Sequence, residues 1–193
     1  NGSVTYYEST GLKIGTVGAA IPGGQGALTS PAGVAANSVT TASTTGVTTV
    51  AGVAGGSNGA VVIAAGATAG SGLTVNKLIT TAPSSGNTAG GSVLLEADGS
   101  IAITNNGGTQ LGAITTTGNG TGAGGEVFIH HTNVVTGQDI TLTGNTAGTV
   151  ISAKGGASGN GGVVTLLNDD GNIALGGGID VTGPSGTDGT IQL

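Results

Sequence analysis

The sequence contains no cysteine and no arginine, and Lys13, Lys77 and Lys154 are its only strongly basic residues. Without cysteine, the chain can form neither a disulfide nor a thiolate metal site. Nucleic-acid binding requires a concentrated patch of positive charge, so three lysines in 193 residues argue against that function and against a polybasic membrane-surface site. No apolar run approaches the roughly 18 residues that a membrane-spanning helix requires.

Charged residues of either sign are scarce as well, since they make up only 6% of the chain. Disordered segments typically combine high net charge with low hydrophobicity, and this composition does not fit them. Glycine occupies 43 positions, far above its usual share of about 7%, yet without the strict three-residue period of collagen. A chain of this length predicts one domain or one repeat array. The composition favours a β protein in which glycine recurs between the strands.

One short pattern recurs along the chain: a glycine, then any residue, then valine or isoleucine, with further apolar residues at alternate positions. Its clearest copy is Gly162-Val163-Val164-Thr165-Leu166. The other copies begin at Gly2, Gly59, Gly91, Gly125 and Gly189, with a degenerate copy at Gly26, and successive starts lie 24 to 37 residues apart. Alternation with period two predicts β-strands in which one set of side chains points inward. The expected inward pairs are Val4/Tyr6, Val61/Ile63, Val93/Leu95, Val127/Ile129, Val164/Leu166 and Ile191/Leu193.

Further apolar strands are predicted behind these copies. Second strands are expected at 101–103, 140–142 and 173–175, and third strands at 79–81, 114–116, 151–153 and 179–181. Glycine-rich linkers follow the third strands, and Asn-Gly and Asp-Gly pairs favour the positive backbone angles of sharp corners. No segment shows the 3.6-residue period of a helix.

Three short strands per repeat predict a parallel β-solenoid, or β-helix, of triangular cross-section. We expect an all-β chain that forms a single solenoid over 1–193, with irregular turns in 1–58 and regular repeats in 59–193. About six to seven turns stacked about 4.8 Å apart would make a rod on the order of 30 Å long. The alternative is a β-sandwich, which short strands separated by turn residues fit as well.

The repeat that begins at Gly90 reads Gly-Gly-x-Val-x-Leu-x-Ala-Asp-Gly-x-Ile-x-Ile through Ile103. This phrasing, with its variants over 59–193, resembles the repeats of filamentous-haemagglutinin-type adhesins. The resemblance implies a right-handed parallel β-helix in a large protein secreted to a bacterial surface. The secretion domain that begins such adhesins is not recognisable here, and the first residue is Asn1 rather than methionine. We therefore expect a processed chain or a section of a longer one.

Aspartates near the predicted corners are the candidate groups for chemistry. Asp98, Asp139 and Asp170 precede second strands in what we interpret as equivalent places, which favours a role as corner residues. Cleavage of a polysaccharide would instead require carboxylates that converge on one groove. We expect no catalytic residue and no bound cofactor, with calcium as the alternative, because carboxylates suit that ion. The calcium candidates crowd the last two turns and are Asp169, Asp170, Asp180 and Asp188.

The segment Phe128-Ile129-His130-His131 holds the only phenylalanine and both histidines. Adjacent residues of a strand point to opposite faces, so the two histidines are not expected to bind one metal ion. The stretch from Ile129 to Ile140 is longer than its counterpart in the preceding turn. His130 and His131 therefore mark a candidate binding loop, and an ordinary decoration of the corner is the alternative.

The outward positions of the first strands include an apolar residue in three consecutive turns, namely Val62, Leu94 and Phe128. Such a stripe predicts packing against a linker of the same chain or against another protomer. The last strand contains Ile191 and Leu193 and shows no capping helix or charged edge. We therefore expect that end of the solenoid to continue into more repeats or to contact another molecule.

These patterns predict a structural, non-catalytic solenoid of a secreted surface adhesin or a self-assembling fibre, located outside the cell or on its surface. The expected partners are copies of the chain itself, through head-to-tail or lateral association, or further repeats of a longer chain, with surface glycans as another class. The alternative function is a carbohydrate-binding or carbohydrate-cleaving β-helix that uses the histidine segment and the acidic corners.

Overall fold

The computed structural model describes residues 4–8, 12–14, 46–48, 59–65, 72–76, 78–104, 113–132, 137–144 and 148–193, the first three ranges as backbone alone. All regular elements in these ranges are β-strands. No helix among the described residues is long and apolar enough to cross a membrane.

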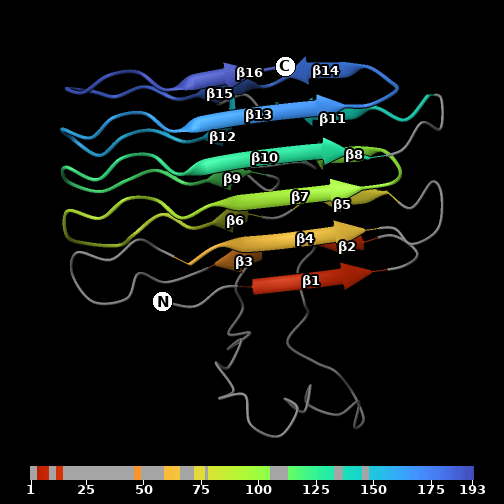
Figure 1. The fold of residues 1–193 in the computed structure, drawn as a ribbon, viewed down its shortest axis with the longest axis horizontal. Helices are drawn as coiled ribbons and strands as arrows, with labels where there is room; N and C mark the ends of the chain where they lie inside the picture. Colours follow the sequence, from red (N-terminus) through yellow and green to blue (C-terminus); the bar gives the residue numbers. More distant parts are fainter. Residues whose placement is uncertain are drawn as a thin grey trace, which may run out of the picture.

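The strands form three sheets in which every described strand pair is parallel (Figure 1). The first sheet contains β1 (Val4–Glu8), β4 (Val61–Ala65), β7 (Val93–Ala97), β10 (Glu126–His131), β13 (Val163–Asn168) and β16 (Thr190–Gln192). The second contains β2 (Leu12–Ile14), β5 (Leu73–Val75), β8 (Ile101–Thr104), β11 (Ile140–Thr143) and β14 (Ile173–Gly176). The third contains β3 (Gly46–Thr48), β6 (Leu78–Thr80), β9 (Ile114–Thr115), β12 (Thr149–Ser152) and β15 (Gly178–Asp180).

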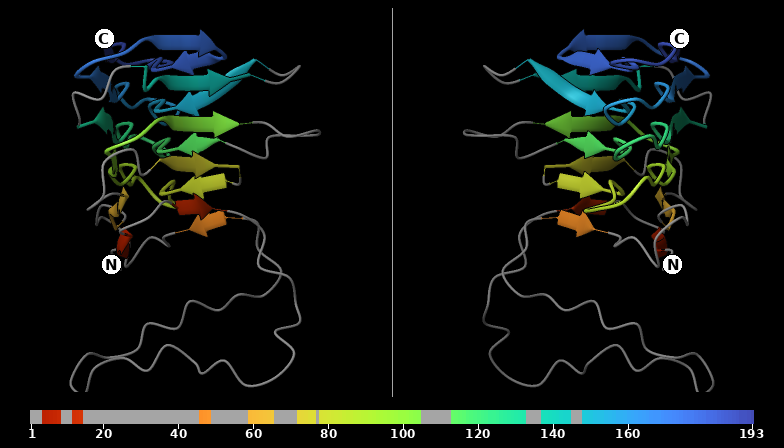
Figure 2. Two further views of the ribbon diagram at one scale, coloured as in Figure 1. Left: turned by 90° about the vertical axis from the view of Figure 1, so that its right-hand side faces the viewer. Right: turned by 90° about the vertical axis from the view of Figure 1, so that its left-hand side faces the viewer.

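Successive strands along the chain lie in successive sheets, so the backbone coils through all three sheets in each turn. In Figure 1 the near strands of the first sheet run from left to right, the strands behind them run back, and the chain climbs from β1 to β16. That winding is right-handed, as is usual for connections between parallel strands. The side views in Figure 2 show the same stacking from one end to the other. The predicted right-handed parallel β-helix is confirmed, and the parallel pairing excludes the alternative β-sandwich.

The described strands make five complete turns and the first strand of a sixth, slightly fewer than the predicted six to seven turns. The degenerate copy at Gly26, which was expected to fill the gap between the first two turns, lies outside the described residues. There is no place for a turn in that gap, because β1 pairs directly with β4 and aligns Val4 with Val61. The two strands β2 and β3 complete the first turn, and neither was predicted.

Inward side chains of the first sheet form two buried columns, as predicted from the alternation. Their fully buried members are Val61, Val93, Val127 and Val164 in one column and Ile63, Leu95, Ile129 and Leu166 in the other. Each such side chain stabilises the fold by about 1.5–3 kcal/mol when it leaves water. Ile191 and Leu193 are 43% and 70% exposed, because β16 is the last strand of its sheet within the described residues. The side chains of the predicted pair Val4/Tyr6 lie outside the described residues.

The second and third sheets complete the core with their own apolar columns. The predicted second strands correspond to β8, β11 and β14, and the predicted third strands to β6, β9, β12 and β15. Register aligns Ile101 with Ile140 and Ile114 with Ile151, and all four side chains are fully buried. In the turns whose side chains are described, like aliphatic residues stack on like, and they form one continuous hydrophobic cluster along the interior.

Glycine pairs at the corner before the first sheet explain why the repeat pattern starts with glycine. A Cβ atom on Gly125 would lie 2.0 Å from the carbonyl oxygen of Gly91 in the turn below, and one on Gly162 would lie 2.0 Å from that of Gly125. The same corner is held by hydrogen bonds of 2.7 Å, which Gly125 N–H donates to Thr116 O and Gly162 N–H donates to Ala153 O. Only glycine allows successive turns to approach this closely.

Candidate functional site

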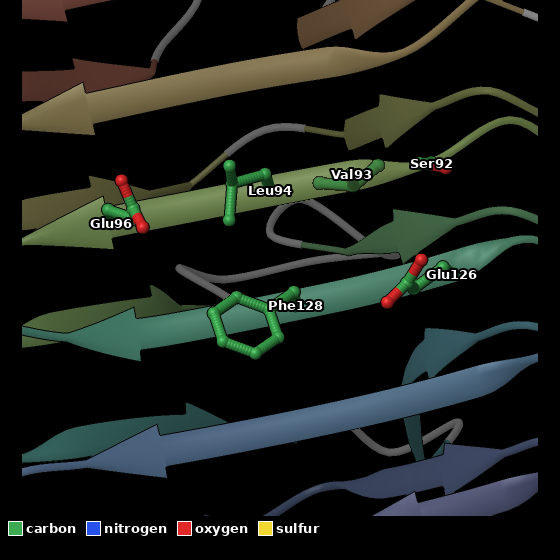
Figure 3. Close-up of a pocket in the computed structure, with 6 residues that line it drawn as sticks. All are labelled: Ser92, Val93, Leu94, Glu96, Glu126 and Phe128. Carbon is green, nitrogen blue, oxygen red and sulfur yellow. The ribbon is translucent and has the colours of Figure 1, made fainter.

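The outer face of the first sheet has a shallow hollow of about 350 Å³ between β7 and β10. Its lining consists of Ser92, Val93, Leu94, Glu96, Glu126 and Phe128 (Figure 3). Parallel register places Leu94 beside Phe128 and Glu96 beside His130. The half-buried side chains of Val62, Leu94 and Phe128 therefore stand in one column on consecutive turns, in the arrangement predicted for the apolar stripe.

The two glutamates lie at opposite ends of this hollow (Figure 3). Glu126 is two residues before Phe128 on β10, and Glu96 is two residues after Leu94 on β7, so strand alternation directs all four side chains to the outer face. The hollow thus combines an apolar floor with a carboxylate at each end. The sequence reasoning identified Leu94 and Phe128 but missed the glutamates, although the two-residue spacing along each strand was the signal that identifies them.

His130 links three turns across the outer face. Its Nε2 atom lies 3.2 Å from Asp169 Oδ1, and its Nδ1 atom lies 3.9 Å from Glu96 Oε1. Its ring meets the ring of Phe128 edge to face, with centroids 5.7 Å apart and an interplanar angle of 74°. The imidazole is therefore held in place beside the hollow by contacts with neighbours on both sides.

His131 points the other way and is fully buried at the corner between the first and second sheets. Asn168 donates hydrogen bonds from Nδ2 to Gln138 O at 3.1 Å and to Asn172 O at 3.0 Å, so its Oδ1 is the atom that faces His131 Nδ1 at 2.9 Å. Because Oδ1 only accepts, the proton of a neutral His131 resides on Nδ1. Its Nε2 atom is buried and has no hydrogen-bond partner in the described structure.

The candidate binding loop at His130 and His131 needs correction in the light of these positions. Both residues lie on strand β10 rather than in a loop, and they face opposite sides as predicted. Since the side chain of His131 is fully buried, it does not contact a ligand at the surface in this structure. Only His130 remains on the outer face, where it is partly exposed. Sequence reasoning gave no indication of Asn168 as the partner of the buried imidazole.

The corner aspartates act as acceptors for backbone and hydroxyl groups of adjacent turns. Asp98 Oδ1 accepts a hydrogen bond of 2.7 Å from Thr132 Oγ1, and Asp139 Oδ1 accepts one of 2.9 Å from Asn172 N–H. The predicted equivalence of Asp98, Asp139 and Asp170 is wrong, because the corners differ in length. Asp98 directly follows β7, and the register of the first sheet makes Thr132 and Asp169 its counterparts in the next two turns. Asp139 instead directly precedes β11, and its counterpart in the next turn is Asn172, which directly precedes β14. The three carboxylates therefore do not share one position in the coil.

The four calcium candidates do not gather at one point. Asp169 contacts His130, and Asp188 Oδ1 accepts a hydrogen bond of 2.9 Å from Gly183 N–H. Asp170 directly follows Asp169 at the corner after β13, and Asp180 ends β15 on another sheet. Within the part of the chain that the structure describes, no three histidine or acidic side chains are placed to hold a metal ion.

The surroundings of Asp180 shift the pKa of its carboxyl group. Burial by itself raises this pKa, whereas hydrogen bonds from Thr182 N–H at 3.1 Å and Thr182 Oγ1 at 2.8 Å lower it. Attraction by the Lys154 ammonium, 3.6 Å away, acts in the same direction as these hydrogen bonds. The pKa of Asp180 therefore lies below its ordinary value of 3.8, which means that folding favours the charged form.

The end of the coil formed by β14, β15 and β16 is apolar and open. Each of these strands is the last of its sheet within the described ranges. Leu175 on β14 is 47% exposed, and Ile173 and Ile179 are only partly buried, although their counterparts one turn earlier are inaccessible to water. This end of the coil therefore exposes both unpaired strand edges and aliphatic side chains.

Comparison of the chain with protein-family models, with curated proteins and with solved structures found no match. The hollow on the first sheet and the open end of the coil are thus the two features from which a function has to be inferred.

Proposed function

We propose that this protein is a structural, non-catalytic section of a secreted surface adhesin or of an extracellular fibre. The observation that carries the proposal is the regular stacking of the strands. Within each of the three sheets the strands follow one another without interruption, and aliphatic side chains lie on similar aliphatic side chains of the next turn. In such a coil each turn buries its apolar face only against its neighbours, so the product is a stiff rod whose length depends on the number of turns. A rod of this kind transmits force and holds other parts at a distance.

The distribution of carboxylates supports a structural role rather than a catalytic one. General acid and base catalysis of glycoside cleavage requires two carboxyl groups that face one bond from either side. Here Asp98 and Asp139 accept hydrogen bonds from residues of the next turn, and Asp188 accepts one from Gly183 in its own turn. The hydrogen bonds of Asp98 and Asp139 therefore hold adjacent turns together.

The open end of the coil supports association along the rod axis. An edge strand exposes a row of N–H and C=O groups that pair with a further strand, unless charge or a covering element prevents it. The inward position of Ile191 on β16 would be covered by the next turn, in the way that Ile191 itself covers Val164. That turn would come from more repeats of the same polypeptide or from another copy.

An extracellular location agrees with two properties of the sequence. The repeat phrasing over 59–193 resembles that of secreted adhesins, and the chain offers trypsin-like proteases only three lysines and no arginine. A rod with few sites for trypsin-like proteases is suited to an environment that contains such proteases.

Sedimentation velocity over a range of protein concentration tests the proposal. We expect the average mass to rise with concentration in the wild type and to remain at one copy in the variant Ile191→Asp, because a charge would then occupy the contact face. The matched control is Leu167→Asp, which places the same charge at a residue of similar exposure, 42% against 43%, on the side of the rod. A wild type that stays monomeric throughout, or a Leu167→Asp variant that loses association equally, would contradict end-to-end assembly.

A further inference from the structure

We propose that the hollow between β7 and β10 binds a lysine or arginine side chain of a partner protein. This inference goes beyond the structural role, because it assigns a specific recognition site to the side of the rod. It rests on the shape of the hollow, on the availability of its two carboxylates for a ligand and on the net negative charge of the chain.

The shape of the hollow fits a cation carried on an apolar stem. Leu94 and Phe128 lie side by side in register and form the floor, and Glu96 and Glu126 stand at its two ends (Figure 3). The aliphatic stem of a lysine or arginine packs well on such apolar surface while its charged head remains near water. The face of an aromatic ring attracts the same head group, since its π electrons are a centre of negative charge.

The carboxylates at the two ends are available for a ligand. No hydrogen bond or ion pair of the described structure engages the carboxylate of Glu126, which is exposed. Among the residues that the structure describes, Glu96 has one polar contact, at 3.9 Å from His130 Nδ1, and this is too long for a hydrogen bond. The corner aspartates differ, because Asp98 and Asp139 accept short hydrogen bonds within the coil. The glutamates of the hollow are thus not needed for the stacking of turns.

The negative charge of the hollow favours a positively charged ligand. Two glutamates repel an anion, and the chain as a whole carries a formal charge of −6. A second copy would present the same excess of negative charge and has only three lysines to offer. Of these, Lys154 lies two residues after β12 of the third sheet and already pairs with Asp180 at 3.6 Å. The complementary occupant is therefore a cationic side chain of a different protein.

The test uses the fact that Phe128 is the only phenylalanine of the chain. When phenylalanine alone is isotope-labelled, its ring signals in a nuclear magnetic resonance spectrum report on the hollow without ambiguity. The probes are the N-acetyl methylamides of lysine and arginine, and the control probe is the corresponding derivative of norleucine, which has a similar stem without the charge. The variants are Glu126→Gln and Glu96→Gln. The control variant is Asp170→Asn, which removes the same charge from a corner outside the hollow.

We expect the cationic probes to shift the ring signals of Phe128 in a saturable way and the norleucine probe to leave them unchanged. Each glutamine substitution should weaken binding by about two- to fivefold, as for an exposed ion pair, and Asp170→Asn should leave it unaltered. Equal shifts with norleucine, or equal weakening by Asp170→Asn, would overturn the proposal. Shifts that occur on addition of unlabelled protein alone would also overturn it, because they would identify a second copy as the occupant.

Discussion

Replacement of Gly125 by alanine tests the close stacking of turns on which the fold depends. The added Cβ would lie 2.0 Å from Gly91 O and 2.9 Å from Gly91 C, whereas ordinary contacts of a Cβ atom begin near 3.4 Å. The atom in the way belongs to the backbone, so no side-chain rotation can relieve the overlap. The two turns would have to separate by more than 1 Å at a corner where Gly125 N–H donates a hydrogen bond of 2.7 Å.

The expected loss in the free energy of unfolding is about 3 kcal/mol, at the upper end of the usual range for overpacking, because backbone must move. A glycine with a different constraint provides the control. Gly137 has a φ of +83° and no described atom within 4 Å of the place that a Cβ atom would take, so Gly137→Ala introduces only the strain of a left-handed residue, about 1–2 kcal/mol. Urea unfolding of both variants measures the difference. A Gly125→Ala variant that is no less stable than Gly137→Ala would refute the steric reasoning.

Individual contacts elsewhere in the coil lead to four further predictions. Leu95→Ala should lower the free energy of unfolding by about 2–5 kcal/mol, since the fully buried side chain lies between two turns; a loss below about 1 kcal/mol in urea unfolding would contradict the packed column. Asn168→Ala should cost about 1–3 kcal/mol, because it leaves the buried imidazole that contacts its Oδ1 without a partner; an unchanged midpoint would speak against that contact. Asp180→Asn should reduce the loss of stability in acid. The folded state lowers the pKa of Asp180, so its stabilising effect is present above the ordinary pKa of 3.8 and disappears as the pH falls through the lower folded value; an acid unfolding profile identical to that of wild type would contradict this. A chelator should leave the urea midpoint unchanged, since no three acidic or histidine side chains in the described ranges are placed to share a metal ion, and a lower midpoint would indicate a bound ion.

Much of the fold could be predicted from the sequence because successive turns of the coil must bury apolar side chains at corresponding positions. The pair Val127 and Ile129 must be apolar to fill the column, and the residues between them must tolerate the surface, so a period of two is visible in the sequence. Stacking also explains why corresponding strands of later turns share isoleucine or leucine at the same register. The glycines that open the later repeats, Gly125, Gly162 and Gly189, are required by the close approach of adjacent backbones.

The first turn and the corners could not be predicted in the same way. In the first turn, strands β2 (Leu12–Ile14) and β3 (Gly46–Thr48) have only three residues each, which is too short for a convincing alternation. The equivalence of the aspartates was misjudged because corners vary in length, and sequence spacing alone does not show which residues stack. The burial of His131 follows from its inward register on β10, but its contact with Asn168 joins residues 37 positions apart. The repeat copies at Gly125 and Gly162 place these two residues at the same offset, but the pattern does not show that their side chains form a hydrogen bond.

Electron cryo-microscopy of the purified protein over a range of concentration tests the central claim most directly. If turns of one molecule continue the coil of the next, the particles should lengthen with concentration at constant width. Their images should show a repeat of about 4.8 Å along the long axis, the spacing of parallel strands that lie across it. Rods of constant single-copy length at every concentration, or assemblies that grow sideways with the strands in another orientation, would contradict a rod that extends through its open end.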